Sequence, residues 1–209
     1  EKPAIQGLDL TIQPNQLTVF VGKSGCGKST LVSLLMGFYK PQQGEILFNG
    51  VDIKQINRHS LYRHVSLVSH SSYIFKGSLR ENMLMALSDA SDDAIYQCLE
   101  QVNLANFVRE NGGLDMMLLS RGTNLSGGQI QRLALARALL HNADLYVFDE
   151  APSNIDVESE EIILQFIQQL KHEKTIVMIS HRLANAVNAD QIYVLQSGHL
   201  AESGDHASL

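Results

Sequence analysis

Two spacings of hydrophobic residues recur along the chain, and together they predict alternating strands and helices. Short apolar runs are typical of buried strands, and they predict strands at 17–21, 44–50, 64–69, 144–148, 175–180 and 191–195. Residues 28–37 predict a helix with three leucines on one face and Gly37 at its end. Asp156 is a candidate N-cap for another helix, whose apolar residues repeat at helical spacing: Ile162, Ile163, Phe166, Ile167 and Leu170.

The middle of the chain has a different pattern. Residues 76–140 show helical spacing and no convincing strand. Alternating strands and helices favour an α/β fold with a mainly parallel sheet and right-handed crossovers. We therefore predict one domain over residues 1–209, with a core of 1–75 and 141–209 and a helical insert at 76–140.

Composition narrows the class of protein. The 209 residues suffice for one domain, and 44% hydrophobic with 18% charged residues is ordinary for a globular chain. A net charge of −6 argues against a general nucleic-acid binder, which carries a basic patch. The two cysteines, Cys26 and Cys98, have no metal-like spacing and favour a reducing compartment over a disulfide framework.

The sequence shows no pattern typical of a membrane-spanning or targeting segment. No run approaches the ~18 consecutive apolar residues of a membrane-spanning helix, and no signal peptide is visible. The chain begins at Glu1 and enters a strand-like pattern within a few residues. We interpret it as a segment of a longer protein.

A glycine-rich loop follows the first predicted strand. Gly22, Gly27, Lys28 and Ser29 match G-x-x-x-x-G-K-[ST], in the strand-to-helix context that a phosphate-binding loop requires. Backbone N–H groups and the positive end of the helix would hold phosphates, Lys28 would reach the β- and γ-phosphates, and Ser29 would ligate Mg²⁺. A glycine-rich turn that matches by chance is the alternative. The predicted nucleotide-binding residues are Gly22, Lys23, Ser24, Gly25, Cys26, Gly27, Lys28, Ser29 and Thr30.

Two carboxylates end the strand predicted at 144–148. Acidic residues at the carboxyl end of such a strand reach the crevice where α/β proteins bind ligands. Asp149 would hold Mg²⁺, and Glu150 would act as general base toward the attacking water. Alone, two acids after a strand are also typical of a solvated loop. The nearby phosphate loop favours the catalytic interpretation.

A second glycine-containing helix start lies at LSGGQ. Ser126 is a candidate N-cap, and two glycines expose N–H groups at the start of the helix that follows. An ordinary capped helix with a flexible start is the alternative. The residues concerned are Leu125, Ser126, Gly127, Gly128 and Gln129.

The order of these motifs, with SNID and SHRL after them, resembles the nucleotide-binding domain of ATP-binding cassette (ABC) transporters over essentially the whole chain. The resemblance implies a P-loop NTPase (RecA-like) α/β fold with a mainly parallel sheet, an antiparallel β edge and an inserted α-helical subdomain. It also implies that two cassettes pack head to tail around two ATP molecules, so that LSGGQ serves the partner's ATP.

Further roles follow from the resemblance. Glu150 would be the catalytic base, Lys28 would assist it, and His181 would be the switch histidine at the γ-phosphate. The D-loop, which crosses the dimer interface, would comprise Ser153, Asn154, Ile155 and Asp156. GSLRENM and SHRL resemble the exporter branch, in which a membrane domain usually precedes the cassette. The implied location is the cytoplasmic face of the plasma or inner membrane, and the adenine-stacking aromatic residue is expected before residue 1.

Two positions depart from the family pattern. His70 replaces the usual glutamine that contacts Mg²⁺ and the lytic water, and imidazole is a poorer ligand for this hard cation than an amide oxygen. Hydrolysis would then be slowed or become pH-sensitive; alternatively, His70 does the same work through water. Ser120 replaces a glutamate expected to face the membrane domain. Both changes are compatible with one half of a heterodimeric exporter.

The function predicted is an ATP-hydrolysing motor domain of an ABC exporter that uses ATP and Mg²⁺ and acts with a second cassette and a membrane domain. The alternative is a non-transport ABC ATPase acting on nucleic acid. Its usual coiled-coil or zinc insertion is missing, and the net charge disfavours it. A P-loop kinase ranks last because LSGGQ has no role there, and an importer cassette remains an alternative within the family.

Overall fold

The computed structural model describes residues 3–151 and 155–209. Ser153 and Asn154 of the predicted D-loop lie outside the described residues. Contacts divide the chain into two compact units. Unit 1 comprises Glu1–Leu67, Asp144–Glu150 and Lys171–Leu209, and unit 2 comprises Val68–Ala143 and Ala151–Leu170. The predicted limits of the helical insert stay a prediction.

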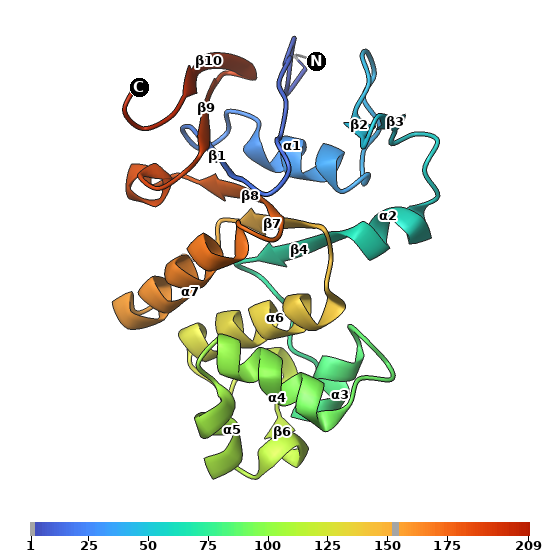
Figure 1. The fold of residues 1–209 in the computed structure, drawn as a ribbon, viewed down its shortest axis with the longest axis vertical. Coiled ribbons are helices and arrows are strands. Elements are labelled where there is room, and N and C mark those ends of the chain that lie inside the picture. The colour runs from blue at the N-terminus through green and yellow to red at the C-terminus, as the bar shows by residue number, and fades with distance from the viewer. Residues whose placement is uncertain (1–2, 152–154) are drawn as a thin grey trace. The chain divides into compact units, whose positions relative to one another are not determined.

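A six-stranded sheet forms the framework of the fold (Figure 1). Its order is β10-β9-β1-β8-β7-β4. Neighbouring strands among β9, β1, β8 and β7 pair in parallel, and β10 pairs with β9 in the antiparallel direction. The mainly parallel sheet and its antiparallel edge are therefore confirmed. The strands are β1 Leu17–Val21, β4 Val65–Ser69, β7 Leu145–Asp149, β8 Thr175–Ser180, β9 Gln191–Gln196 and β10 His199–Gly204.

The core of unit 1 lies between this sheet and α1 (Lys28–Leu35). All five residues of β1 are buried, as expected for a strand with a parallel neighbour on each side. Phe20 stacks on Tyr193 of β9 with ring centroids 5.2 Å apart, and the Tyr193 hydroxyl donates to the Thr11 carbonyl at 2.8 Å. The same hydrophobic cluster includes Leu31 and Val32 of α1. Helix α1 is thus anchored against the strand that precedes it.

Two smaller elements of unit 1 differ from the sequence prediction. The strand predicted at 44–50 is only β2 (Leu47–Phe48), which pairs with β3 (Val51–Asp52), a strand that was not predicted. Asn49 and Gly50 form the turn between them, with φ of 50° and 79°. Because both strands are short and lie at the surface, their hydrophobic pattern is weak. Helix α2 (Arg58–His64) follows with Asn57 as its N-cap.

Unit 2 is built mainly from helices. They are α3 Leu79–Leu84, α4 Asp92–Gln101, α5 Ala105–Glu110, α6 Gly127–His141 and α7 Val157–Leu170. The prediction that the segment 76–140 contains no strand is wrong, because β5 (Gly77–Ser78) pairs antiparallel with β6 (Met117–Leu118). Single-turn 3₁₀ helices, η1 (Gly113–Asp115) and η2 (Ser120–Gly122), lie in the same segment, and η3 (Leu183–Ala186) belongs to unit 1.

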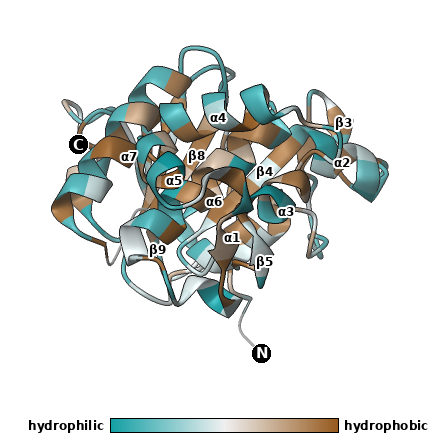
Figure 2. Ribbon diagram, turned by 90° about the horizontal axis from the view of Figure 1, so that it is seen from below, coloured by the Kyte–Doolittle hydropathy of each residue, from teal (hydrophilic) through white to brown (hydrophobic). Residues whose placement is uncertain are grey.

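Helix α6 forms the centre of unit 2, and its hydrophobic residues are prominent in Figure 2. Helices α3, α4 and α7 all pack against it. Leu133, Leu135 and Ala136 of α6 are buried, as are Ile163 and Ile167 of α7. Serine N-caps fix the starts of α3, α4 and α6. Among the described residues, none of the helices combines the length and the apolar character that a membrane crossing requires.

Candidate functional site

The glycine-rich loop lies between β1 and α1 in unit 1, as predicted. Gly27 is the N-cap of α1 with φ of 113°, and no side chain caps this helix start. The first N–H groups of α1 therefore have no side-chain acceptor, which leaves them for an external anion. Lys23, Ser24 and Gly25 are exposed on the same loop. This end of the helix is open to a ligand.

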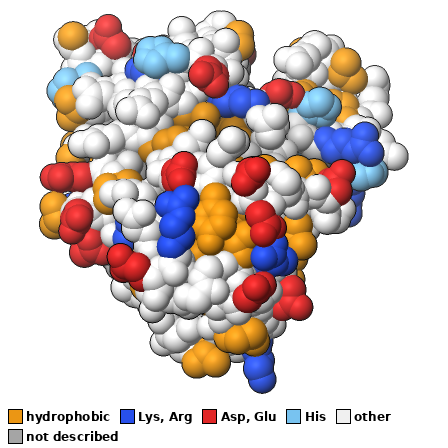
Figure 3. Space-filling view, turned by 60° about the horizontal axis from the view of Figure 1, so that its bottom comes forward, with side chains coloured by type: hydrophobic (Ala, Val, Ile, Leu, Met, Phe, Trp, Pro, Cys, Tyr) orange, Lys and Arg blue, Asp and Glu red, His pale blue; other side chains and the backbone are white. Residues whose placement is uncertain are grey.

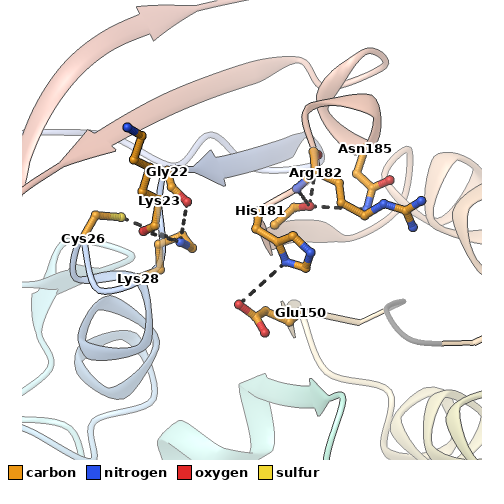
Figure 4. A network of polar contacts seen from close by, with 9 residues as sticks. Gly22, Lys23, Cys26, Lys28, Glu150, His181, Arg182 and Asn185 are labelled. Carbon is orange, nitrogen blue, oxygen red and sulfur yellow. Dashed lines mark hydrogen bonds and ion pairs between the residues drawn. The ribbon is translucent and has the colours of Figure 1, made fainter.

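Lys28 folds back over the loop (Figure 4). Its Nζ donates to the Gly22 carbonyl at 2.6 Å and to the Lys23 carbonyl at 3.1 Å, and it lies 3.8 Å from Cys26 Sγ. The residue is only 6% exposed. An ammonium group that is held against the loop by two backbone carbonyls is suited to bind phosphate oxygens.

Two glycines of the loop, Gly22 and Gly27, are sterically required. A Cβ at Gly22 would lie 2.7 Å from Cys26 Sγ and closer still to the Leu195 carbonyl, and a Cβ at Gly27 would lie 2.7 Å from the Ala4 carbonyl. At Gly25 a Cβ would meet nothing within 4 Å, although its φ of 79° favours glycine. The loop packs tightly against Ala4 and Leu195 on one side, and Lys23–Gly25 are exposed on the other. The exposed side is where a chain of phosphates would fit.

Asp149 and Glu150 lie where the sequence places them, at the carboxyl end of β7. Asp149 pairs in register with Ile179 of β8, and the Glu150 N–H donates to the Ile179 carbonyl at 3.1 Å. Glu150 has φ of 53°, in the left-handed region that residues with side chains seldom occupy. This turn directs its side chain away from the strand and toward His181 (Figure 4).

His181 follows β8 and faces Glu150. Its Nδ1 lies 4.0 Å from Glu150 Oε1, and the two side chains are 53% and 40% exposed. Buried Ser180 holds the turn that presents His181: its hydroxyl accepts from the Arg182 N–H at 2.9 Å and donates to the Arg182 carbonyl at 3.1 Å. Ser180 was not predicted as a site residue, although serine before a turn is a local signal for this geometry.

Strand order explains why these three segments meet. The loop follows β1, His181 follows β8 and Glu150 follows β7, and β8 lies between β1 and β7 in the sheet. Since the three strands are parallel, their carboxyl ends lie at one edge. Ser29 and Asp149 supply a hydroxyl and a carboxylate, the oxygen donors that Mg²⁺ prefers. Among the described residues, no group of three or more His, Cys, Asp or Glu could hold a metal ion.

The LSGGQ segment lies in unit 2 at the start of α6. Ser126 is the N-cap: its Oγ accepts from the Gln129 N–H at 3.1 Å, and its own N–H donates to Gln129 Oε1 at 2.8 Å. This reciprocal capping box confirms the predicted N-cap. Gly127 and the Ser126 side chain are exposed, while Gly128 is buried. The helix start is therefore capped and exposed.

The predicted cap of α7 is also present in unit 2. Asp156 Oδ1 accepts from the Ser159 N–H at 2.8 Å. Hydrogen bonds from the Ser159 backbone and hydroxyl lower the pKa of Asp156 below its ordinary value. A Cβ at Gly128 would lie 2.7 Å from Asp156 Oδ2 and would collide with the Ser159 hydroxyl. The starts of α6 and α7 are therefore in close contact, which requires glycine at this point of LSGGQ.

The two departures from the family pattern are both exposed residues of unit 2. His70 follows β4 directly, and the Ser69 hydroxyl beside it lies 3.0 Å from that of Ser71. Ser120 Oγ lies 3.3 Å from the Tyr73 hydroxyl. The predicted residues thus form two groups, one within each unit: the loop, Asp149, Glu150 and His181 in unit 1, and His70, LSGGQ and Asp156 in unit 2.

Comparison with known proteins gives consistent matches. The family model described as "ABC transporter" matches residues 5–153. An uncharacterized ABC transporter ATP-binding protein of Haemophilus influenzae is 78% identical over 209 residues, which are all of this chain and 37% of that protein. The ATP-dependent lipid A-core flippase of Francisella novicida is 39% identical over 211 residues, covering 100% of this chain and 36% of the flippase.

A solved structure agrees with these relatives. The structure of a bacterial Atm1-family ABC exporter with ATP bound superposes with a TM-score of 0.92 at 33% identity, covering 98% of this chain and 36% of that one. The chain thus spans little more than a third of the length of these three proteins. Its family match extends over more than half of its residues and includes the phosphate loop, LSGGQ and the two carboxylates. The chain belongs to the ABC transporter family.

Proposed function

We propose that this chain is the ATP-binding and ATP-hydrolysing cassette of an ABC exporter. One observation carries the proposal: Glu150 and His181 face each other at 4.0 Å, at the strand edge from which the phosphate loop also emerges. A loop alone would bind nucleotide. A carboxylate with a histidine partner beside it adds the groups that hydrolysis needs.

ATP is the substrate in this proposal. The uncapped start of α1 would hold its phosphates through N–H groups, and Lys28 would exchange its carbonyl acceptors for phosphate oxygens. Ser29 and Asp149 would hold Mg²⁺. Bound Mg²⁺ would supply charge neutralisation on the phosphate oxygens.

Glu150 would accept the proton of the water that attacks the γ-phosphorus, and ADP would leave. His181, on the turn held by Ser180, would orient the water and the γ-phosphate by hydrogen bonding. Its contact distance to Glu150 is long for a direct hydrogen bond, as is usual for catalytic groups without their substrate.

A second cassette is the proposed partner. The capping box at the start of α6 uses the N–H groups of Ser126 and Gln129, so the N–H groups of the two glycines between them are the ones that an anion would bind. In a head-to-tail dimer this helix start would complete the site of the partner chain. The D-loop residues, of which Ile155 and Asp156 are described, would lie at the same interface.

A membrane domain is the other proposed partner, fused before the cassette and placing it on the cytoplasmic face of the plasma or inner membrane. The exporter and flippase relatives are almost three times as long as this chain. Unit 2 also exposes large apolar side chains near Ser120, namely Tyr73, Phe75, Met117 and Leu119. Exposed apolar groups of this kind mark a protein-interaction surface.

No observation favours the nucleic-acid alternative. The face displayed in Figure 3 mixes acidic, basic and apolar side chains without a basic stripe. The relatives described above are a transporter ATP-binding protein, a lipid A-core flippase and an exporter.

Mg²⁺-dependent ATP hydrolysis tests the proposal. We expect the chain to bind ATP and release phosphate. The Glu150→Gln variant should lower kcat at least ~100-fold because it removes a general base. Its ATP affinity, measured by equilibrium binding, should stay close to that of the original chain.

Asp89→Asn, an exposed carboxylate in unit 2, is the control and should leave kcat unchanged. Equal phosphate release by the Glu150→Gln variant would assign the base to another residue. Failure of the original chain to bind ATP would reject the proposed function itself.

A further inference from the structure

The turn between β9 and β10 contacts the phosphate loop from behind. Ser197 and Gly198 form this turn, with φ of 51° and 83°. The Gly198 N–H donates to the Cys26 carbonyl at 3.0 Å, and the Gly198 carbonyl accepts from the Gln6 N–H at 2.8 Å. One buried residue, Gly198, thus links the phosphate loop to the segment near residue 5, although it lies 172 positions after Cys26 in the sequence.

The segment Ala4–Ile5 lies against both glycines. A Cβ at Gly198 would lie 2.6 Å from the Ala4 carbonyl oxygen and 3.4 Å from Ile5 Cα. A Cβ at Gly27 would lie 2.7 Å from the same Ala4 oxygen and 3.2 Å from Ile5 Cγ1. The segment therefore fills the space between the turn and the N-cap of α1, and neither side has room for a methyl group.

The other end of the loop meets the same hairpin. A Cβ at Gly22 would collide with the Leu195 carbonyl of β9. Both Gly22 and Gly27 are consequently held by elements distant in sequence. Because Gly27 sets the direction of the first N–H groups of α1, any displacement of this packing would move the phosphate-binding groups.

We propose that the β9–β10 turn is a positioning element for the phosphate loop, with Gly198 as its central residue and Ala4–Gln6 as the spacer. The inference rests on the proposed function, since it concerns the affinity of the loop for ATP. Gly198 does not touch the nucleotide. It acts through the Cys26 carbonyl and through the spacer on Gly27.

The chain contains a matched control for Gly198. Gly50 follows Asn49 in the β2–β3 turn with φ of 79°, and Asn49 has φ of 50°, so the two turns have the same backbone conformation. A Cβ at Gly50 would meet nothing within 4 Å. Alanine at either position bears the same local strain. Only at Gly198 does it also press on the spacer.

The experiment compares Gly198→Ala with Gly50→Ala and the original chain. Equilibrium competition with a fluorescent ATP analogue gives the ATP dissociation constant, and circular dichroism confirms that each protein is folded at the temperature used. We expect Gly198→Ala to weaken ATP binding about tenfold, the loss of one charge-assisted hydrogen bond. Gly50→Ala should bind as the original chain does. Equal affinity of the two folded variants would overturn the inference.

A second pair covers the case in which Gly198→Ala does not fold. Ile5→Ala loosens the spacer beside Gly27, and Ile12→Ala removes the same atoms from another partly buried isoleucine of the same core. We expect Ile5→Ala to weaken ATP binding at least about threefold and Ile12→Ala to leave it unchanged. Equal affinities in this pair would reject the spacer role. If the original chain bound no ATP, the proposed function would be rejected, and the inference that rests on it would be rejected too.

Discussion

Glu150 combines an unusual backbone conformation with a proposed catalytic role. Left-handed φ in a residue with a side chain costs about 1–3 kcal/mol, and such strain is found where a site needs a particular direction. Here the hydrogen bond from the Glu150 N–H to Ile179 holds the turn. The strained turn aims the carboxylate at His181 instead of along β7. The sequence predicted the residue, but no local pattern indicated its conformation.

Replacing His70 by glutamine should change the rate of ATP hydrolysis. His70→Gln would restore an amide oxygen, a better Mg²⁺ ligand than imidazole, at an exposed position directly after β4. We expect kcat for Mg²⁺-dependent hydrolysis to rise by about tenfold, the usual size of effects close to a metal. The measurement is kcat as a function of Mg²⁺ concentration.

His172→Gln is the matched change, because His172 is also exposed but lies outside every predicted site residue. It should leave kcat unchanged. An unaltered kcat and pH profile in His70→Gln would show that His70 performs the work of the amide, the alternative that the sequence left open.

At the scale of elements, the contact between the starts of α6 and α7 is the feature that most constrains LSGGQ. Glycine inside a helix is usually a weakness, and alanine there stabilises by about 1 kcal/mol. At Gly128 the space is already taken by Ser159 and Asp156. Alanine at this position should therefore destabilise the protein instead of stabilising it.

We predict that Gly128→Ala lowers the free energy of unfolding by about 1–3 kcal/mol, as overpacking does. Urea denaturation of the variant and of the original chain gives the difference. Adding Ser159→Gly, which removes the colliding side chain, should recover at least half of the loss in a double-mutant cycle. A stabilising effect of Gly128→Ala alone would contradict the crowded contact.

Element prediction succeeded where burial is strong. β1, β4, β7, β8 and β9 were predicted within a residue or two, because each is a short strand that is rich in apolar residues and largely buried in the sheet. β3, β5, β6 and β10 were not predicted from the hydrophobic pattern. β3, β5 and β6 have only two residues each, and exposed residues such as Val51 and Met117 leave no alternation to detect. β10 lies at the edge of the sheet, and most of its residues are exposed.

At the scale of the whole molecule, the proposed site is shared between two chains. The prediction is that specific ATPase activity rises with protein concentration, because each proposed active site would need the phosphate loop of one chain and the LSGGQ of another. Phosphate release per chain, measured across a wide concentration range, tests this. Constant specific activity would mean that the site is complete within one chain.

A complementation experiment makes the same test sharper. Lys28→Ala disables the loop and Ser126→Arg blocks the start of α6, so each variant alone should be inactive. Their mixture contains heterodimers with one intact loop facing one intact LSGGQ, and activity should reappear. If the mixture showed no ATPase activity although sedimentation detected dimers, a shared site would be excluded.

The family and the positions of the motifs in the fold were predictable because the motifs are short, contiguous and close to strand ends. The supporting contacts were not. Gly198 touches Cys26 and Ala4 through backbone atoms alone, so no side-chain pattern encodes the partnership. Ser159 meets Gly128 through its side chain, but the two residues lie 31 positions apart on different helices, so no local pattern indicates the contact either. These contacts arise from tertiary packing, which a single sequence does not display.

The position of Lys28 has a consequence for how the chain divides its free energy between folding and binding. This residue is 6% exposed, and its ammonium group is already hydrogen-bonded to two backbone carbonyls without any ligand. Dehydration of the cation and loss of its rotamer freedom are therefore completed when the chain folds, and a ligand meets a preorganised charge. At this one side chain, the arrangement that favours nucleotide binding therefore lowers the stability of the chain without nucleotide.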